Sequence, residues 1–123
     1  MPKIMVVDDD KEFTTLYKEY LTMVGFETIV ENKSSNVMAY AEETKPDLFL
    51  LDLMMPEPDG FKVCRMLRAS PTFCRTPIII VTALNNTDSK IVAIGAGAND
   101  YITKPFYIDD LKSRINALLE KSK

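Results

Sequence analysis

Residues 48–56 read LFLLDLMMP, an apolar run with one aspartate, Asp52, in its middle. Apolar residues that do not alternate with polar ones are typical of a strand covered on both faces, as in a parallel sheet. An ionised carboxylate in such a layer loses its hydration, a cost that proteins accept mainly where the charge is paired, bound to metal or used in chemistry. The run therefore predicts a buried central strand and a functional carboxylate on it.

Strand and helix signals alternate on both sides of this run. Further strands are expected at 3–7, 27–30, 77–81 and 101–103, and a helix with periodic apolar residues is expected after each strand. This order predicts a single α/β domain over 1–123, a doubly wound parallel sheet of five strands with five helices and right-handed crossovers. The positions expected to face the core are Phe13, Leu16, Tyr17, Tyr20, Leu21 and Val24, then Val37, Tyr40 and Ala41, then Phe61, Cys64 and Leu67, then Ile91 and Ile94, and finally Leu111, Ile115, Leu118 and Leu119.

Several residues punctuate these helices. Gly25, Pro71 and Gly97 are expected to end the first, third and fourth helices. Gly95 lies inside the fourth, so we expect that end to be soft, although the glycine could instead permit close packing. The expected helix starts and caps are Asp10, Ser34 or Ser35, Asp59-Gly60, and Thr87 or Asp88.

Composition excludes several classes of function. The net charge is −3, so no basic surplus favours direct nucleic-acid binding. Neither a secretory signal nor an apolar stretch of membrane-spanning length occurs, which predicts a cytoplasmic protein without membrane insertion. Cys64 and Cys74 lack metal-ligand spacing and are expected to be free thiols. Because the chain has no histidine, its chemistry must use oxygen ligands, lysine or hydroxyls.

Polar residues directly follow the predicted strands. In a parallel sheet all strands point their carboxyl ends at one edge, where ligands bind, so these side chains should converge there. Taken singly, each has an ordinary interpretation as a helix cap, a turn residue or a solvated lysine. The residues are Asp8, Asp9, Asp10, Asp52, Thr82 and Lys104.

The charges at this edge suggest what binds there. The carboxylates of Asp8, Asp9 and Asp52, offset by the ammonium of Lys104, leave two negative charges, which match one divalent cation. Oxygen-only ligands favour Mg²⁺. Such a cation, together with Lys104 and Thr82, suits phosphoryl transfer, and Asp52 is the expected acceptor because it lies between the acid pair and the Thr/Lys pair.

Four motifs in order resemble the receiver domain of bacterial two-component response regulators: VVDDD at 6–10, LLDLMMPEPDG at 50–60, IIIVTA at 78–83 and DYITKPF at 100–106. The resemblance covers essentially the whole chain. It implies a flavodoxin-like sheet with the strand order 2-1-3-4-5, for which a receiver is a known example. It also implies a phosphorylation-dependent signalling switch that catalyses at most its own phosphorylation and dephosphorylation.

The resemblance implies a role for each site residue. Asp52 would accept a phosphoryl group from the phosphohistidine of a sensor kinase or from a phosphotransfer protein. Asp9 and Asp52 would ligate Mg²⁺ directly, Met54 would add its backbone carbonyl, and Asp8 would act mainly through a coordinated water.

The resemblance also implies a switch. Lys104, followed by a cis peptide bond to Pro105, would pair with the carboxylate and then with the phosphate. Thr82 would hydrogen-bond a phosphate oxygen, and Tyr101 would swing inward as Thr82 is drawn in. The surface of the last two strand–helix units would then signal to a target protein or an output domain. The alternative for Tyr101 is an aromatic packed on the last helix.

The chain departs from the family pattern at three positions. Pro58 replaces a usually apolar residue before Asp-Gly and should stiffen the loop over the acceptor. Met54 and Leu84, two residues after the acceptor and the threonine, are apolar where polar side chains in receivers help to place the hydrolytic water. We therefore expect a long-lived phosphoryl group.

Three other functions share some of these features. An aspartate-nucleophile phosphohydrolase would also have an Asp-x-Asp after an apolar strand, but it usually needs further acidic ligands and often a cap. A nucleotide- or flavin-binding module would need a Gly-rich loop after the first strand, where this chain has three acids. A degenerate receiver used only for docking would not need the full acid set. No output domain follows the last predicted helix, so the unit is expected either to act alone or to belong to a longer regulator.

Overall fold

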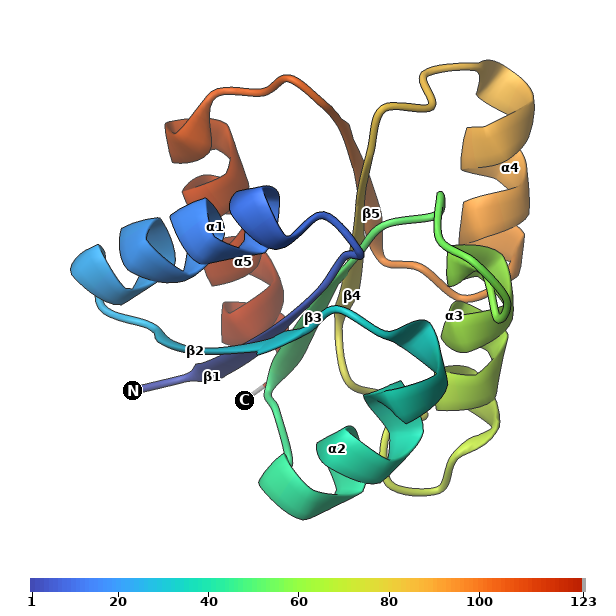
Figure 1. The fold of residues 1–123 in the computed structure, drawn as a ribbon, viewed down its shortest axis with the longest axis horizontal. Helices are drawn as coiled ribbons and strands as arrows, with labels where there is room; N and C mark the ends of the chain where they lie inside the picture. Colours follow the sequence, from blue (N-terminus) through green and yellow to red (C-terminus); the bar gives the residue numbers. More distant parts are fainter. Residues whose placement is uncertain (123) are drawn as a thin grey trace.

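The computed structural model describes residues 1–122 and contains one parallel sheet. The strands are β1 (Lys3–Val7), β2 (Glu27–Glu31), β3 (Leu48–Leu51), β4 (Ile78–Thr82) and β5 (Asp100–Thr103). Their order in the sheet is β2-β1-β3-β4-β5, which confirms the order implied by the resemblance (Figure 1).

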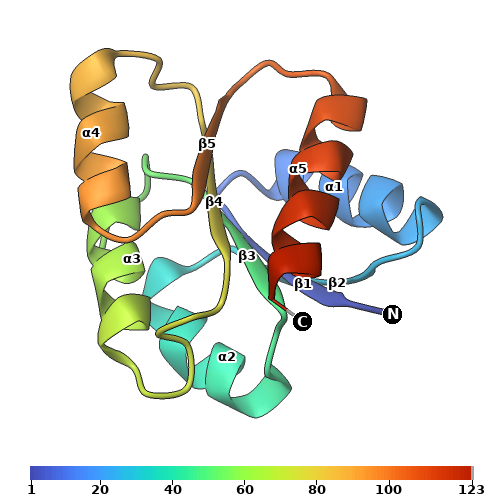
Figure 2. The same cartoon turned by 180° about the vertical axis from the view of Figure 1, so that it is seen from behind.

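Helices cover both faces of the sheet. They are α1 (Lys11–Met23), α2 (Val37–Thr44), α3 (Gly60–Ala69), α4 (Thr87–Gly95) and α5 (Ile108–Lys121), with a short 3₁₀ turn η1 (Ser34–Asn36) before α2. Both views show α1 and α5 on one face and α2, α3 and α4 on the other (Figures 1 and 2). Among residues 1–122, no helix has the length and apolar character needed to cross a membrane.

The central strands are buried on both faces, as the opening run predicts. Every residue of β3 and β4 is buried. Alternate residues of β3 enter different cores, because successive side chains of a strand point to opposite faces. Leu48 and Leu50 pack under α1 and α5, whereas Phe49 and Leu51 pack under α2, α3 and α4.

Two helix starts agree with the sequence and two differ from it. The carboxylates of Asp10 and Asp59 cap α1 and α3. Asn86, rather than Thr87 or Asp88, caps α4, because its extended backbone lets its side chain accept from the Ser89 N–H at 2.7 Å. Neither Ser34 nor Ser35 caps α2. Both lie in η1, and the Ser34 hydroxyl instead donates to the Pro56 carbonyl at 3.0 Å.

The prediction of core-facing residues is wrong at three helical positions. Leu16, Ile91 and Ile94 are exposed by 62%, 64% and 52%. In α4 the small side chain of Ala93 packs on the sheet, so the larger residues point outward. Helical spacing identifies an apolar stripe, but it does not say which part of that stripe meets the sheet.

Two turns bring the chain back to the sheet in the way that their residues require. Gly25 and Gly97 follow α1 and α4 with φ of +104° and +112°, a region that residues with side chains disfavour.

Two peptide bonds before proline are cis. The Lys104–Pro105 bond is cis, as the resemblance implies, and the Glu57–Pro58 bond is cis as well. Cys64 and Cys74 are free thiols, as expected.

Candidate functional site

The carboxyl ends of four strands meet at one edge of the sheet. Asp8 and Asp9 follow β1, Asp52 follows β3, Thr82 ends β4 and Lys104 follows β5. Val7 pairs with Leu51, and Thr82 pairs with Thr103, so the polar residues after these strands are brought side by side. The structure therefore gathers at this edge the residues that the sequence singled out.

Three carboxylates form a compact acidic cluster. One oxygen from each of Asp8, Asp9 and Asp52 lies within 4.8 Å of the others. Asp8 and Asp52 are buried, whereas Asp9 is exposed. Hard oxygen ligands with an open side toward solvent fit Mg²⁺, which keeps several of its waters when bound to proteins. The donor set is therefore suited to a divalent cation.

The ammonium of Lys104 lies against this cluster. Its Nζ is 2.7 Å from Asp8 Oδ2 and 3.4 Å from Asp52 Oδ2, so in this structure Asp8 is its closer partner. The same Nζ is 3.7 Å from the centroid of the Phe13 ring. The helical spacing of α1 places Phe13 only in the core. Its place in the first turn of α1, directly after the acids, is the signal that could have linked it to this edge.

Burial makes the charge of Asp8 costly. Loss of hydration is the main cause that raises the pKa of its carboxyl above 3.8, and the nearby charge of Asp52 adds to it. Two hydrogen bonds oppose this rise, one from the Lys104 ammonium and one from the Asp10 N–H at 3.0 Å. The acidic cluster is thus destabilised by its own charge, which a bound cation would offset.

The loop after β3 fixes the side chain of Asp52. The Met54 N–H donates to Asp52 Oδ1 at 3.1 Å. Gly60, the first residue of α3, packs so closely on this loop that a Cβ there would collide with the Asp52 carbonyl oxygen. Asp59 thus caps α3, and Gly60, of the one residue type without a Cβ, lets the helix approach the loop after β3.

Thr82 and Tyr101 are connected through the loop after β4. Thr82 is fully buried, and its Oγ1 accepts from the Leu84 N–H at 3.5 Å. The Tyr101 hydroxyl donates to the Leu84 carbonyl at 2.6 Å, and its ring packs against the core cluster under α2, α3 and α4. Partial burial, and next the charge of Asp52, raise the pKa of Tyr101. Leu84 thus joins the two predicted switch residues.

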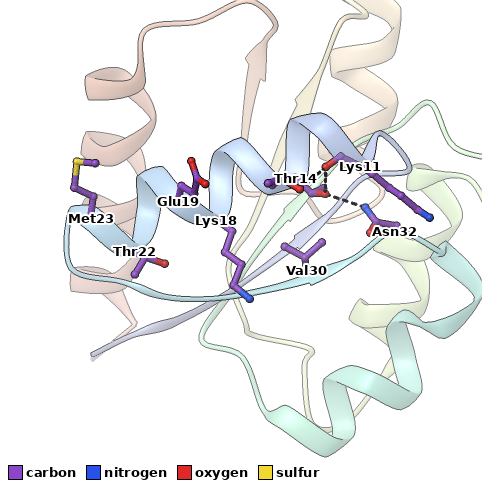
Figure 3. Close-up of a pocket in the computed structure, with 9 residues that line it drawn as sticks. Lys11, Thr14, Lys18, Glu19, Thr22, Met23, Val30 and Asn32 are labelled. Carbon is purple, nitrogen blue, oxygen red and sulfur yellow. Dashed lines mark hydrogen bonds between the residues drawn. The ribbon is translucent and has the colours of Figure 1, made fainter.

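A groove lies away from this site. It holds about 750 Å³ between α1 and β2 and is lined by Lys11, Thr14, Thr15, Lys18, Glu19, Thr22, Met23, Val30 and Asn32 (Figure 3). Asn32, which lines this groove, also contacts the acidic cluster, because its Nδ2 donates to the Asp8 carbonyl at 2.8 Å as well as to Thr14 Oγ1 at 3.0 Å. Its size alone assigns it no role.

A sequence profile described as the response regulator receiver domain matches residues 4–116. The chain belongs to this family. It is 37% identical over 122 residues to the DNA-binding dual master transcriptional regulator RpaA of Synechocystis, a match that covers 99% of this chain and 51% of that protein. The chain spans about half the length of the curated relatives it matches.

Solved receiver structures have the same fold. The receiver domain of the Francisella response regulator 1452 is 35% identical, with a TM-score of 0.92 and full coverage of both chains. The BeF3-activated N-terminal receiver domain of Klebsiella pneumoniae RstA is also 35% identical, with a TM-score of 0.90 over 95% of this chain and 97% of that one. The flavodoxin-like receiver fold and the two-component family expected from the sequence are therefore confirmed.

Proposed function

We propose that this receiver takes a phosphoryl group onto Asp52 from the phosphohistidine of a sensor kinase or a phosphotransfer protein. The observation that carries this proposal is the position of the buried Asp52 carboxylate, 3.4 Å from the Lys104 ammonium and with an oxygen within 4.8 Å of oxygens of two further carboxylates. A buried nucleophile beside a fixed cation is an arrangement that phosphoryl transfer requires. The absence of histidine from the chain agrees with a donor on another protein.

Mg²⁺ is the cofactor that we assign to the acidic cluster, where it would neutralise charge on the transferring group. Asp9 and Asp52 would bind it directly, Met54 would offer its backbone carbonyl, and Asp8 would act mainly through water. Asp8 would have a second role, because its 2.7 Å contact holds the Lys104 ammonium beside the acidic cluster. Lys104 in turn would pair with the phosphoryl oxygens.

The switch would run through Thr82 and Tyr101. A phosphoryl group on Asp52 adds charge and acceptor oxygens that the Thr82 hydroxyl can approach as a donor. Moving Thr82 would pull on Leu84, whose carbonyl holds the Tyr101 hydroxyl at 2.6 Å. The surface around β4, α4, β5 and α5 would then change for a downstream target or an output domain. RpaA is named as a DNA-binding regulator and is about twice as long as this chain, and we assign no direct nucleic-acid contact to the receiver itself, whose net charge is −3.

The chain would form one receiver unit over 1–123 that acts in the cytoplasm as a signalling switch. Its own catalysis would be limited to self-phosphorylation and self-dephosphorylation. A true phosphohydrolase would differ in turning over a generic phosphoester many times per chain, which a steady-state release of phosphate would reveal.

Incubation with acetyl phosphate tests the proposal. In Mg²⁺ buffer we expect the intact mass of the chain to rise by one phosphoryl group, and we expect no rise with a chelator or in Asp52→Asn. Asp59→Asn is a matched control, because it removes a nearby carboxylate while asparagine keeps the helix cap. An unmodified wild-type chain, or an Asp52→Asn chain that is still modified, would refute the assignment.

A further inference from the structure

The ammonium of Lys104 has a third neighbour besides the two carboxylates. Its Nζ lies 3.7 Å from the centroid of the Phe13 ring, well inside the distance at which a cation is attracted to an aromatic face. We propose that Phe13 is a positioning residue, which holds the Lys104 ammonium beside the acidic cluster through this cation–π contact. This inference rests on the function proposed above and adds to it a residue of α1.

The backbone of Phe13 is fixed by the same turn that carries the acids. Its N–H donates to Asp10 Oδ1 at 3.2 Å, which starts α1. The Asp10 N–H in turn donates to Asp8 Oδ1 at 3.0 Å, and Asp8 Oδ2 accepts from Lys104. The ring and the carboxylate that contact the ammonium are therefore set in place by one short segment.

The ring is also supported from the other side. Its centroid lies 3.9 Å from that of the Tyr17 ring, with the two ring planes tilted by 45°, and Tyr17 meets Phe106 edge to face at 5.5 Å. Phe106 lies two residues after Lys104, in the loop that follows β5. The rings of Phe13, Tyr17 and Phe106 thus connect α1 to the loop after β5 that carries Lys104. The Phe13 ring therefore has a defined orientation.

An open groove makes such support necessary. A space of about 650 Å³ adjoins the lysine and is lined by Phe13, Leu16, Tyr17, Tyr20, Ala83, Lys104, Pro105, Phe106 and Ile108. The Lys104 side chain is still 20% exposed, and a flexible ammonium gains hydration by turning outward. The face of Phe13 offers a cation an attraction that an aliphatic side chain of similar volume lacks.

The position of the ammonium matters during transfer. With acetyl phosphate, a carboxylate oxygen of Asp52 bonds to phosphorus while the bond from phosphorus to the acetyl oxygen breaks, and acetate leaves with that electron pair. Negative charge on the phosphoryl oxygens then lies beside Lys104, and preorganised cations stabilise it most. An ammonium that spends part of its time in the groove stabilises this charge less.

Two substitutions and a control test the contact by kinetics. We expect Phe13→Leu to lower the initial rate of phosphorylation by acetyl phosphate about threefold to tenfold, the range of a partly buried cation–π contact. Phe13→Tyr keeps the aromatic face and should restore a rate near that of wild type. Leu16→Ala, in the same groove, should leave the rate unchanged. The Mg²⁺ concentration for half-maximal rate should be the same in all variants, because a general distortion of the site would raise it.

Proton NMR of the metal-free chain provides a second readout that needs no phosphorylation. The ring current of Phe13 should shift the ε-methylene protons of Lys104 upfield of those of the other lysines, with Lys104→Arg used for assignment. The shift should persist in Phe13→Tyr and disappear in Phe13→Leu. Unshifted wild-type protons would overturn the inference even if Phe13→Leu failed to fold, as would equal phosphorylation rates in Phe13→Leu and wild type. A wild-type chain that is never phosphorylated would instead refute the proposed function, while the NMR shift would still report the contact.

Discussion

Asp8 is a buried carboxylate whose charge destabilises the metal-free protein. Its side chain is 3% exposed, and burial raises the pKa of its carboxyl. We therefore expect Asp8→Asn to increase the free energy of unfolding at pH 7.5 without divalent cations, by about 1–3 kcal/mol, the scale of one poorly compensated polar burial. Lys104 keeps Asp52 as a partner in this variant. Urea unfolding measures the difference.

The pH dependence of this effect has a definite sign. Because the pKa of Asp8 is higher in the folded than in the unfolded chain, the folded state binds more protons between the two values, and this residue's penalty grows as pH rises through that window. The gain in free energy of unfolding from Asp8→Asn should be full above the pKa that Asp8 has in the folded chain, and it should disappear below the unfolded pKa of about 3.8. A variant less stable than wild type at pH 7.5 would contradict this account.

The side chains of Met54 and Leu84 bear on the lifetime of the phosphoryl group. Met54 is 54% exposed beside Asp52, and its thioether is too weak an acceptor to orient an attacking water. We expect a long-lived phosphoryl group in wild type and faster loss in Met54→Asn, which introduces a polar side chain. Intact mass followed over time in Mg²⁺ buffer measures both rates. Rapid loss from wild type without a phosphatase would refute the hypothesis.

At the scale of elements, α4 is held to the rest of the fold by few buried side chains. Only Ala93 of this helix is buried, Ile91 and Ile94 face outward, and Gly95 is its last residue. A Cβ at Gly95 would meet no described atom within 4 Å. We predict that α4 amides exchange faster than those of β2, and that Gly95→Ala slows this exchange and stabilises the chain by about 0.5–1 kcal/mol.

Gly97 offers the matched comparison. Its φ is +112°, and a Cβ there would collide with the side chain of Arg68, so Gly97→Ala should destabilise the chain where Gly95→Ala does not. Hydrogen exchange with mass spectrometry measures both variants. If α4 proves as protected as β2, the expectation of a soft fourth helix is wrong.

The elements also show where sequence patterns stop being informative. The periodicity of α1 and α5 predicts both helices and most of their core residues, although it also assigns the exposed Leu16 of α1 to the core. For α4 the same pattern identifies the helix but assigns Ile91 and Ile94 to the core, since spacing carries no information on which neighbour covers a face. Likewise, the cap of α4 is Asn86 and not the expected Thr87 or Asp88. The start of a helix depends on the backbone conformation of a single residue, which the apolar pattern does not specify.

At the scale of the whole molecule, the gathering of acidic residues at one edge of the sheet follows from few rules, whereas the strand order is implied by the family resemblance. The apolar runs around Asp52 and Thr82 predict buried parallel strands, and parallel strands bring their carboxyl ends together. Contacts that depend on side-chain direction, such as Lys104 on Phe13 or the Tyr101 hydroxyl on Leu84, do not follow from strand ends and needed the structure.

Binding of Mg²⁺ should be coupled to the stability of the whole chain. A ligand that binds only the folded state raises the free energy of unfolding by about 2.7 kcal/mol when its free concentration is 100 times its dissociation constant. We expect Mg²⁺ to raise the Tm of wild type and to have a much smaller effect on Asp9→Asn. Asp10→Asn removes the same charge one residue away but keeps a capping side chain, so it should respond like wild type. Equal responses of Asp9→Asn and wild type would argue against the assigned ligands.

The most direct test of the central claim is the position of the phosphoryl group. Reduction of the phosphorylated chain with borohydride converts an aspartyl phosphate into homoserine, which peptide sequencing by mass spectrometry locates. We predict homoserine at position 52 and aspartate at positions 8 and 9. Homoserine at another position, or none after treatment with phosphodonor and Mg²⁺, would contradict the account.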